Sequence, residues 1–380
     1  MRTAIYKLLQ LLFSCRILFP LRRRKIFFMS YYGAQYGCSP KYLSEYIAGS
    51  HADWDIVWAF TDTGAHREIA GIRAVRYLSW RFFYELCTAQ VLVTNYRMPK
   101  FFCKPADQLY VQTWHSSLRL KMIEGDAEQA LPPHYVDMAK HDSRQTDVLL
   151  SGCRYSTEIF RRAFWYDGVI EETGTPRMDV LLRDDAPLHR TIRQRLGLAP
   201  ETRILLYAPT FRKDNSLRCY DVDFSSLTAT LHEVWGGDWQ VLLRLHPHLH
   251  EFSHELCAAA EVVDATGYDD IQELLCIADC VLSDYSSLIF DFAATCRPCL
   301  LYVPDLEDYT AADRQLYFRL ADLPFPAART NAELRAAVRD FDGEAYSRRV
   351  TDFLSRVGSY ETGHASEKVF TMITKHLHHV

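Results

Sequence analysis

The sequence predicts an α/β fold with two doubly wound parallel sheets, and three observations support this prediction. Short apolar runs alternate with segments of helical periodicity, which is the pattern of β-strand–helix–β-strand units. The chain has 380 residues, more than the roughly 250–300 that one hydrophobic core usually serves. The alternation stops at residues 175–200, where Gly, Pro and charged residues gather, and then starts again. We therefore expect two domains joined near this segment.

In the first half, short apolar runs predict the strands. Runs rich in β-branched and aromatic residues favour strands, and apolar residues spaced by three or four favour helices. The expected strands are residues 25–29, 55–60, 91–94, 109–113 and 148–151. The expected helices are residues 41–48, 80–89 and 156–165.

In the second half the same alternation predicts another parallel sheet. The expected strands are residues 203–208, 240–245, 280–283 and 299–303. The expected helices are residues 227–235, 270–276 and 287–294. Folds of this kind bind ligands beyond the carboxyl ends of their strands, so we expect a cleft between the two domains.

Residues 1–25 combine an apolar run with a cationic cluster. Lys7, Gln10 and Arg16 interrupt the run, so it is shorter than the about 20 residues that a membrane span needs. As a helix the segment is amphipathic and ends in the basic residues 22–25, which suits the surface of an anionic membrane. The alternative, a helix packed on the domain's own sheet, stays open.

The composition excludes some classes of protein. A net charge of -5 argues against a nucleic-acid binder that relies on overall positive charge. An odd number of cysteines, 11, indicates a reducing compartment rather than a disulfide framework. The cysteines with zinc-like spacing lie in apolar segments, so we interpret them as small buried hydrophobic residues; they are Cys276, Cys280, Cys296 and Cys299.

Three loops follow predicted strands of the second half, and all three suit an anion. They are residues 207–214 (YAPTFRKD), 244–248 (RLHPH) and 282–293 (LSDYSSLIFDFA). In the last loop a helix is expected to start near Ser287, and the amides of a helix start bind phosphate well. Arg212 and His246 would add cationic donors beside it. A helix that is capped by its own serines and binds nothing is the alternative.

In the first half, a predicted strand ends at the sequence WHSSLRLK. His115 stands at the strand's carboxyl end, where α/β proteins place catalytic groups. The alternative is a structural histidine that packs under Trp114. The residues that follow are polar and basic and could attract a phosphate-bearing substrate or form a solvated turn; they are Ser116, Ser117, Arg119 and Lys121.

Taken together, these segments resemble the CDP-glycerol glycerophosphotransferases, which include teichoic acid primases and polymerases and related capsule enzymes. The motifs that carry the resemblance are WHSSLRLK, RRAFWY, GTPRMDVLL, YAPTFRKD, RLHPH, DYSSLIFDFA and GHASEKV. They occur in the family's order and cover nearly the whole chain. The resemblance implies a GT-B fold. Its expected parts are an acceptor domain at 26–180, a CDP-donor domain at 181–355 and a terminal helix at 356–380 that returns to the first domain.

One motif departs from the family pattern. The family commonly has Trp-His-Gly-Thr-Pro where this chain has Trp114, His115, Ser116, Ser117 and Leu118. The histidine is kept and the glycine and proline are not. The departure concerns the identity of the acceptor rather than the chemistry.

The resemblance implies that an acceptor hydroxyl attacks the phosphorus bonded to an alditol and that CMP leaves. The donor would be CDP-glycerol or CDP-ribitol, and the acceptor a lipid-linked glycan or polymer at the inner, cytoplasmic face of the membrane. His115 is the expected general base, since neutral imidazole suits that role near neutral pH. His246 could donate to the departing CMP, and Asp291 could hold the ribose. The expected donor-binding residues are Thr210, Arg212, Arg244, His246, Asp284, Ser286, Ser287 and Asp291.

The sequence shows no carboxylate pair with evident metal-site spacing, so we expect no cofactor and no bound metal. Turnover in excess EDTA should equal turnover without it. A substantial loss of turnover in EDTA would contradict this expectation.

Two other functions remain possible at this stage. A GT-B glycosyltransferase would use the same anion-binding loops for the diphosphate of a nucleotide sugar. A scaffold at the membrane surface would keep the fold without activity, although histidines at 115 and 246 argue against it.

Overall fold

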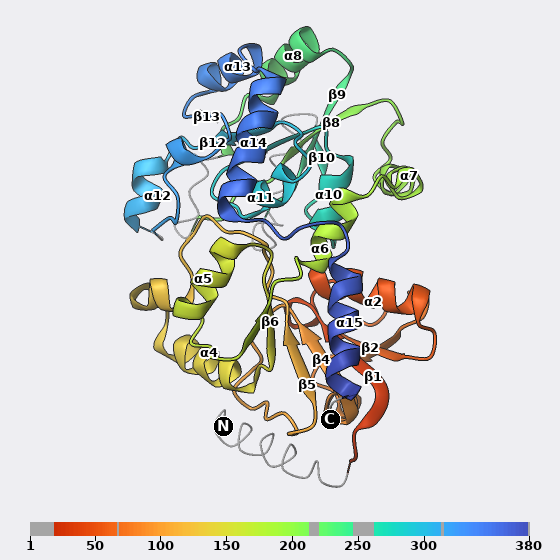
Figure 1. The fold of residues 1–380 in the computed structure, drawn as a ribbon. Coiled ribbons are helices and arrows are strands. Elements are labelled where there is room, and N and C mark those ends of the chain that lie inside the picture. Colours follow the sequence, from red (N-terminus) through yellow and green to blue (C-terminus); the bar gives the residue numbers. More distant parts are fainter. Residues whose placement is uncertain (1–18, 67, 213–219, 246–261, 313–314, 379–380) are drawn as a thin grey trace. The chain divides into compact units, whose positions relative to one another are not determined.

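The computed structural model describes residues 19–66, 68–212, 220–245, 262–312 and 315–378 (Figure 1). The chain forms two compact units. Unit 1 comprises Met1–Ser117, Ile123–Asp179 and Tyr360–Val380, and unit 2 comprises Leu118–Met122 and Val180–Ser359. Each unit contains a parallel sheet with helices, which confirms the predicted α/β class.

The sheet of unit 1 has seven parallel strands in the order β3-β2-β1-β4-β5-β6-β7. The strands are β1 Arg22–Met29, β2 Asp55–Phe60, β3 Arg73–Arg76, β4 Ala89–Thr94, β5 Leu109–Gln112, β6 Val148–Leu150 and β7 Val169–Glu171. The strand order reverses between β1 and β4, and doubly wound folds place their ligand sites beside such a point. The ends of β1, β4 and β5 therefore frame the candidate site of this unit.

Helices cover both faces of this sheet, which explains why its central strands are apolar throughout. Ile26 and Phe28 of β1 point to the face covered by α2 and α15, whereas Phe27 and Met29 point to the face covered by α3. The helices of unit 1 are α2 Cys38–Ser50, α3 Trp80–Thr88, α4 Pro133–Gln145, α5 Arg154–Ala163, α6 Pro176–Asp179 and α15 Ala365–His378. Figure 1 shows α15 beside α2, far from it in sequence.

The structure corrects the amino boundary of the first domain. Residues 22–25, predicted as the basic end of a separate segment, are the first half of β1. Lys25 is fully buried, where it pairs with Glu85 and donates to the Thr88 hydroxyl at 2.5 Å. The predicted amphipathic part, residues 1–18, lies outside the described residues.

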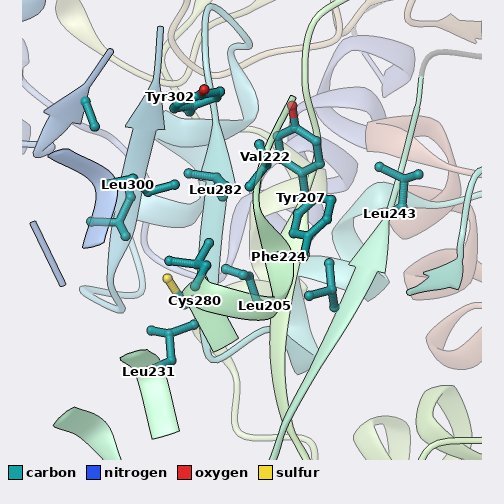
Figure 2. Close-up of a cluster of buried hydrophobic side chains, with 14 of the residues drawn as sticks. Leu205, Tyr207, Val222, Phe224, Leu231, Leu243, Cys280, Leu282, Leu300 and Tyr302 are labelled. Atoms are coloured by element: carbon teal, nitrogen blue, oxygen red, sulfur yellow. The ribbon is translucent and has the colours of Figure 1, made fainter. Parts of the chain in front are cut away.

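The sheet of unit 2 has six parallel strands in the order β10-β9-β8-β11-β12-β13. They are β8 Arg203–Tyr207, β9 Trp239–Leu243, β10 Val263–Asp264, β11 Cys280–Ser283, β12 Cys299–Tyr302 and β13 Ala327–Ala328. Figure 2 shows the core on one face of this sheet, where Leu205, Leu282 and Leu300 of neighbouring strands pack with Phe224. This core keeps β8, β11 and β12 in register, so the loops after them start close together.

Helices on this sheet complete unit 2. They are α7 Ala186–Arg195, α8 Phe224–Trp235, α10 Ile271–Ile277, α11 Leu288–Ala293, α12 Leu306–Ala312, α13 Asn331–Arg339 and α14 Gly343–Val357. Gly358 ends α14 in the left-handed region with φ of 67°, a conformation that favours glycine. After it, the chain enters unit 1 at Tyr360 and forms α15.

The sequence prediction missed short or polar elements. Edge strands β3 and β7 are only partly buried, so their apolar pattern is weak. The segment at 175–200, predicted from its composition to join the domains, contains α6 and α7 as well as the change of unit after Asp179.

Candidate active site

His115 lies just beyond the carboxyl end of β5 in unit 1, in a pocket of aromatic rings. Its ring centroid is 4.3 Å from that of Trp114 and 5.2 Å from that of Tyr96, whose ring plane is inclined to it by 29°. The imidazole is half-buried rather than sealed in the core. The structure thus shows both features that the sequence left open, a packed ring and a position at the catalytic edge of the sheet.

A hydrogen bond defines the orientation of this imidazole. Nδ1 of His115 lies 3.2 Å from the main-chain oxygen of Asn95 at the end of β4. A carbonyl oxygen only accepts, so Nδ1 carries the proton, and in the neutral ring the lone pair is then on Nε2. The Asn95 side chain in turn bonds the Tyr31 amide and the Ser30 hydroxyl, each at 3.0 Å, which joins the ends of β1 and β4.

The backbone around His115 is unusually strained. Tyr31, Tyr32, Cys38 and Trp114 have positive φ values of 47°, 55°, 62° and 52°. Bulky side chains rarely adopt this left-handed region, and such residues concentrate at functional sites where the surrounding structure holds them. The strain therefore supports a functional role for this edge of the sheet.

The predicted acceptor-binding residues do not form one exposed patch. Ser116, Ser117 and Arg119 are buried, and only Lys121 is half-buried. The main-chain oxygen of Ser117 accepts from the Ser156 hydroxyl at 2.7 Å within unit 1. From Leu118 to Met122 the chain belongs to unit 2, and the contact of these residues with an acceptor stays a prediction.

Within unit 2, Lys121 is held by the segment after α12. It forms an antiparallel bridge with Leu316, and its Nζ lies 5.4 Å from the Tyr309 ring centroid. Hydrogen bonds from the Met122 amide to Gln315 (2.9 Å) and from the Tyr317 amide to Leu120 (2.7 Å) extend the pairing. Residues 120–122 thus form a short strand-like pairing that begins three residues after Ser117.

Asp284 joins the loops after β8 and β11 in unit 2. Its carboxylate accepts from the Thr210 amide at 2.9 and 3.0 Å and from the Thr210 hydroxyl at 2.6 Å. Nη2 of Arg212 lies 2.9 Å from the same carboxylate. Asp284 is 2% exposed, so these bonds shape the loops from inside. Three of the predicted donor-binding residues are therefore brought together.

Arg212 has a second carboxylate partner that the sequence analysis missed. Its Nε and Nη2 donate to Asp305 at 2.6 and 3.2 Å, a two-pronged arrangement that holds the guanidinium firmly. Asp305 follows β12, so the rule that functional groups gather at strand ends could have found it. The carboxylates of Asp284 and Asp305 thus balance the charge of Arg212, and these ion pairs hold the loop after β8 to the loops after β11 and β12.

Tyr285 completes this cluster. Its hydroxyl donates to Asp305 at 3.1 Å, and its ring stacks on Tyr309 with centroids 3.9 Å apart. Burial, reinforced by the negative charges of Asp305 and Asp284, raises the pKa of Tyr285 well above its usual value. The hydroxyl therefore stays protonated and remains a donor.

The remaining predicted donor-binding residues are placed individually. Ser286 and Ser287 are half-buried at the start of α11, a helix of only six residues. Asp291 is buried and accepts from the Gln272 amide group at 3.2 Å. Arg244 donates to the main-chain oxygens of Ala265 (3.2 Å) and Thr266 (2.6 Å), fastening the loop after β10. Their contacts with a donor stay predictions, and His246 lies outside the described residues.

The cysteine prediction holds for three of the four residues. Cys276, Cys280 and Cys299 are buried, whereas Cys296 is exposed. No group of three or more metal-ligating side chains occurs in the described part of the chain, and no helix there is long and apolar enough to cross a membrane.

Comparison with known proteins agrees with this architecture. The family model for CDP-Glycerol:Poly(glycerophosphate) glycerophosphotransferase matches residues 11–375. The teichoic acid poly(glycerol phosphate) polymerase of Bacillus subtilis (strain 168) is 31% identical over 383 residues, covering 98% of this chain and 51% of that protein. Its counterpart in Bacillus spizizenii is 30% identical over 380 residues, covering 97% of this chain and 96% of the relative.

A solved structure has the same fold across nearly the whole chain. A variant of the wall teichoic acid polymerase TagF, soaked with CDPG, superposes with a TM-score of 0.85 at 29% identity, covering 98% of this chain and 94% of that one. The chain spans about half the length of the Bacillus subtilis relative, 51%.

Proposed function

Because the chain belongs to the CDP-glycerol:poly(glycerophosphate) glycerophosphotransferase family, we propose that it transfers glycerol phosphate from CDP-glycerol to a hydroxyl group in teichoic acid synthesis. The acceptor is a lipid-linked glycan or a growing polymer. The acceptor oxygen forms a bond to the phosphorus that carries glycerol, the bond from that phosphorus to CMP breaks, and CMP leaves. The hydroxyl proton passes to Nε2 of His115.

The observation that carries this proposal is the orientation of His115. The Asn95 carbonyl holds the proton on Nδ1, so the neutral ring presents a basic nitrogen at the carboxyl edge of the sheet. Phosphoryl transfer needs alignment and charge stabilisation more than covalent catalysis. A base that is already oriented by the protein meets part of that need.

The proposal assigns the donor to unit 2. The loops fastened by Asp284 present the Thr210 region beside Ser286 and Ser287, whose hydroxyls and amides are suitable donors to a diphosphate. His246 would add a donor to the departing CMP.

The alternative, a glycosyltransferase using a nucleotide sugar, is separated from the proposal by the product. Purified protein is incubated with a synthetic lipid-linked acceptor and CDP-glycerol, CDP-ribitol or a UDP-sugar. Release of CMP with CDP-glycerol, accompanied by a mass increase of one glycerol phosphate per step, supports the proposal. Release of UDP with a UDP-sugar would replace it, and CMP release with CDP-ribitol alone would change the alditol. The length of the product separates a primase from a polymerase.

We also propose that the surface of unit 1 around Trp80 rests on an anionic membrane at the cytoplasmic face. Trp80 is 75% exposed, and Leu78 and Phe19 are 49% and 43% exposed. Trp80 lines a cavity of about 630 Å³ together with the arginines 22, 73 and 81 and the carboxylates Asp55 and Glu85. Exposed aromatic side chains beside cations are typical of the interface between lipid and water.

Loss of two cations from this surface should weaken binding to anionic vesicles. Each basic side chain near such a surface contributes about 1 kcal/mol, so the double variant Arg22→Ser with Arg81→Ser should bind phosphatidylglycerol vesicles roughly 30-fold more weakly in sedimentation. The control is Arg348→Ser with Arg349→Ser, exposed cations on α14 of unit 2. Membrane docking through this surface would be contradicted if both double variants bound phosphatidylglycerol vesicles equally well. It would also be contradicted if the parent protein bound phosphatidylcholine vesicles as well as phosphatidylglycerol vesicles.

A further inference from the structure

We propose that Arg177 is a positioning residue for His115, an inference that rests on the proposed function of His115 as the base. Arg177 belongs to the GTPRMD sequence, residues 174–179, for which the reaction itself supplies no role. It comes after β7 and is far from β5 in the sequence.

The geometry of Arg177 points directly at the proposed base. Its side chain is buried, at 4% exposure, and Nη1 donates to the main-chain oxygen of His115. The same nitrogen lies 3.5 Å from Sγ of Cys38, the first residue of α2. A buried guanidinium thus holds the peptide group of His115 against the start of a neighbouring helix, through a charge-assisted hydrogen bond.

The loop that carries His115 needs such a contact. β5 ends at Gln112. One more hydrogen bond continues its pairing with β4, from the Thr113 amide to the main-chain oxygen of Thr94 at 2.9 Å. Trp114 then adopts the left-handed region, with φ of 52°, so the chain leaves the extended path of β5 just before His115. A backbone carbonyl in a poorly hydrated site requires a donor, and Arg177 supplies it.

Arg177 is itself held by a clamp between two distant segments. Glu361 accepts from the Thr175 amide (3.0 Å) and hydroxyl (2.8 Å). Asp179 accepts from the amides of Ala365 and Ser366, each at 2.8 Å, which caps α15. These bonds fix α6 on both sides of Arg177.

The glycine that opens this motif fits the same clamp. Gly174 has φ of 82°, and a Cβ there would lie 2.8 Å from a carboxylate oxygen of Glu361. The GTPRMD sequence is therefore held by Glu361 and by Ala365 and Ser366 of the GHASEKV motif, and Arg177 in its middle donates to the His115 carbonyl.

The test compares Arg177→Ala, Arg177→Lys and the parent protein in the CMP-release assay with CDP-glycerol. A misplaced base lowers turnover without weakening donor binding, so we expect kcat of Arg177→Ala to fall about 30- to 100-fold. KM for CDP-glycerol should change by less than about threefold, because it reports donor binding rather than base position. Arg177→Lys keeps the charge with a different reach, and its kcat should be intermediate.

Added guanidinium chloride at millimolar concentration separates positioning from general stability. The ion can occupy the space left in Arg177→Ala and donate to the His115 carbonyl, so part of the lost kcat should return. The matched control is Arg297→Ala, which removes a half-buried arginine that donates to the main-chain oxygens of Leu275, Cys276 and Ala278 in unit 2. That variant should lower the melting temperature, with kcat per folded molecule unchanged and no rescue by guanidinium.

The possible results are distinct. The inference is overturned if folded Arg177→Ala has the kcat of the parent. It is also overturned if the loss of activity equals the fraction of Arg177→Ala that is unfolded and guanidinium does not restore it. If the alanine variant does not fold, Arg177→Lys decides: reduced kcat at an unchanged melting temperature supports positioning, and unchanged kcat overturns it. Full activity of His115→Ala would instead refute the assignment of the base, whatever Arg177 does.

Discussion

Replacing His115 by alanine should lower kcat by about 100- to 10,000-fold while leaving the affinity for CDP-glycerol within about threefold. A positioned general base contributes roughly 10²–10⁴-fold to a rate, and we propose the His115 imidazole, oriented by the Asn95 carbonyl, as that base. The donor is assigned to loops of unit 2, which this change does not touch. Single-turnover CMP release measures the first quantity, and calorimetric titration with CDP-glycerol measures the second.

A second histidine of the same unit serves as the control. His141 on α4 is also half-buried, and its Nε2 bonds the main-chain oxygen of Phe102 at 2.9 Å. His141→Ala removes the same ring from a site that we assign no role in the reaction, and it should keep turnover. The base is misassigned if His115→Ala retains more than about a tenth of the parent's kcat.

Removing the Asp284 carboxylate should destabilise unit 2 and weaken donor binding together. Removing one partner of a buried ion pair costs about 3–5 kcal/mol, and we expect the lower end of this range because Arg212 keeps Asp305 as a counter-charge. In Asp284→Ala the amide and hydroxyl of Thr210 also lose their acceptor. At about 2–4 °C for each kcal/mol, we expect the melting temperature to fall by roughly 10 °C.

The control for this variant removes another carboxylate of unit 2. Asp223 caps α8 by accepting from the Ser226 amide at 3.0 Å and is exposed, so Asp223→Ala should cost only about 1 kcal/mol. CDP-glycerol should stabilise the parent and Asp223→Ala against heat, and Asp284→Ala much less. Equal melting temperatures for both variants would show that the Asp284 cluster is not a structural centre of these loops.

The sequence predicted the central strands and the positions that end them, because continuous apolar runs mark strands that are covered on both faces. It did not predict β3 or β7, since an edge strand such as β3, with only Val75 buried, has little apolar pattern to detect. The polar helix α4 was missed for a similar reason.

Candidate site residues were found where a rule about strand ends applies, as at His115, Arg212 and Asp284. Their partners were not found, because partnership depends on which strands are neighbours. Asn95 reaches His115 because β4 lies beside β5, and Asp305 reaches Arg212 because β12 follows β11 in the sheet. Arg177 stands 62 residues after His115, and no local pattern pairs it with a loop after β5.

The unit that carries His115 closes only with the last part of the chain. Val369, Phe370 and Ile373 of α15 fill its core beside β1 and β2, yet all of unit 2 is translated before them. On the ribosome, the second unit to begin synthesis is thus the first able to finish folding, the reverse of the usual order. A premature stop codon that removes only α15 would leave unit 2 intact and the imidazole-bearing unit with an open core.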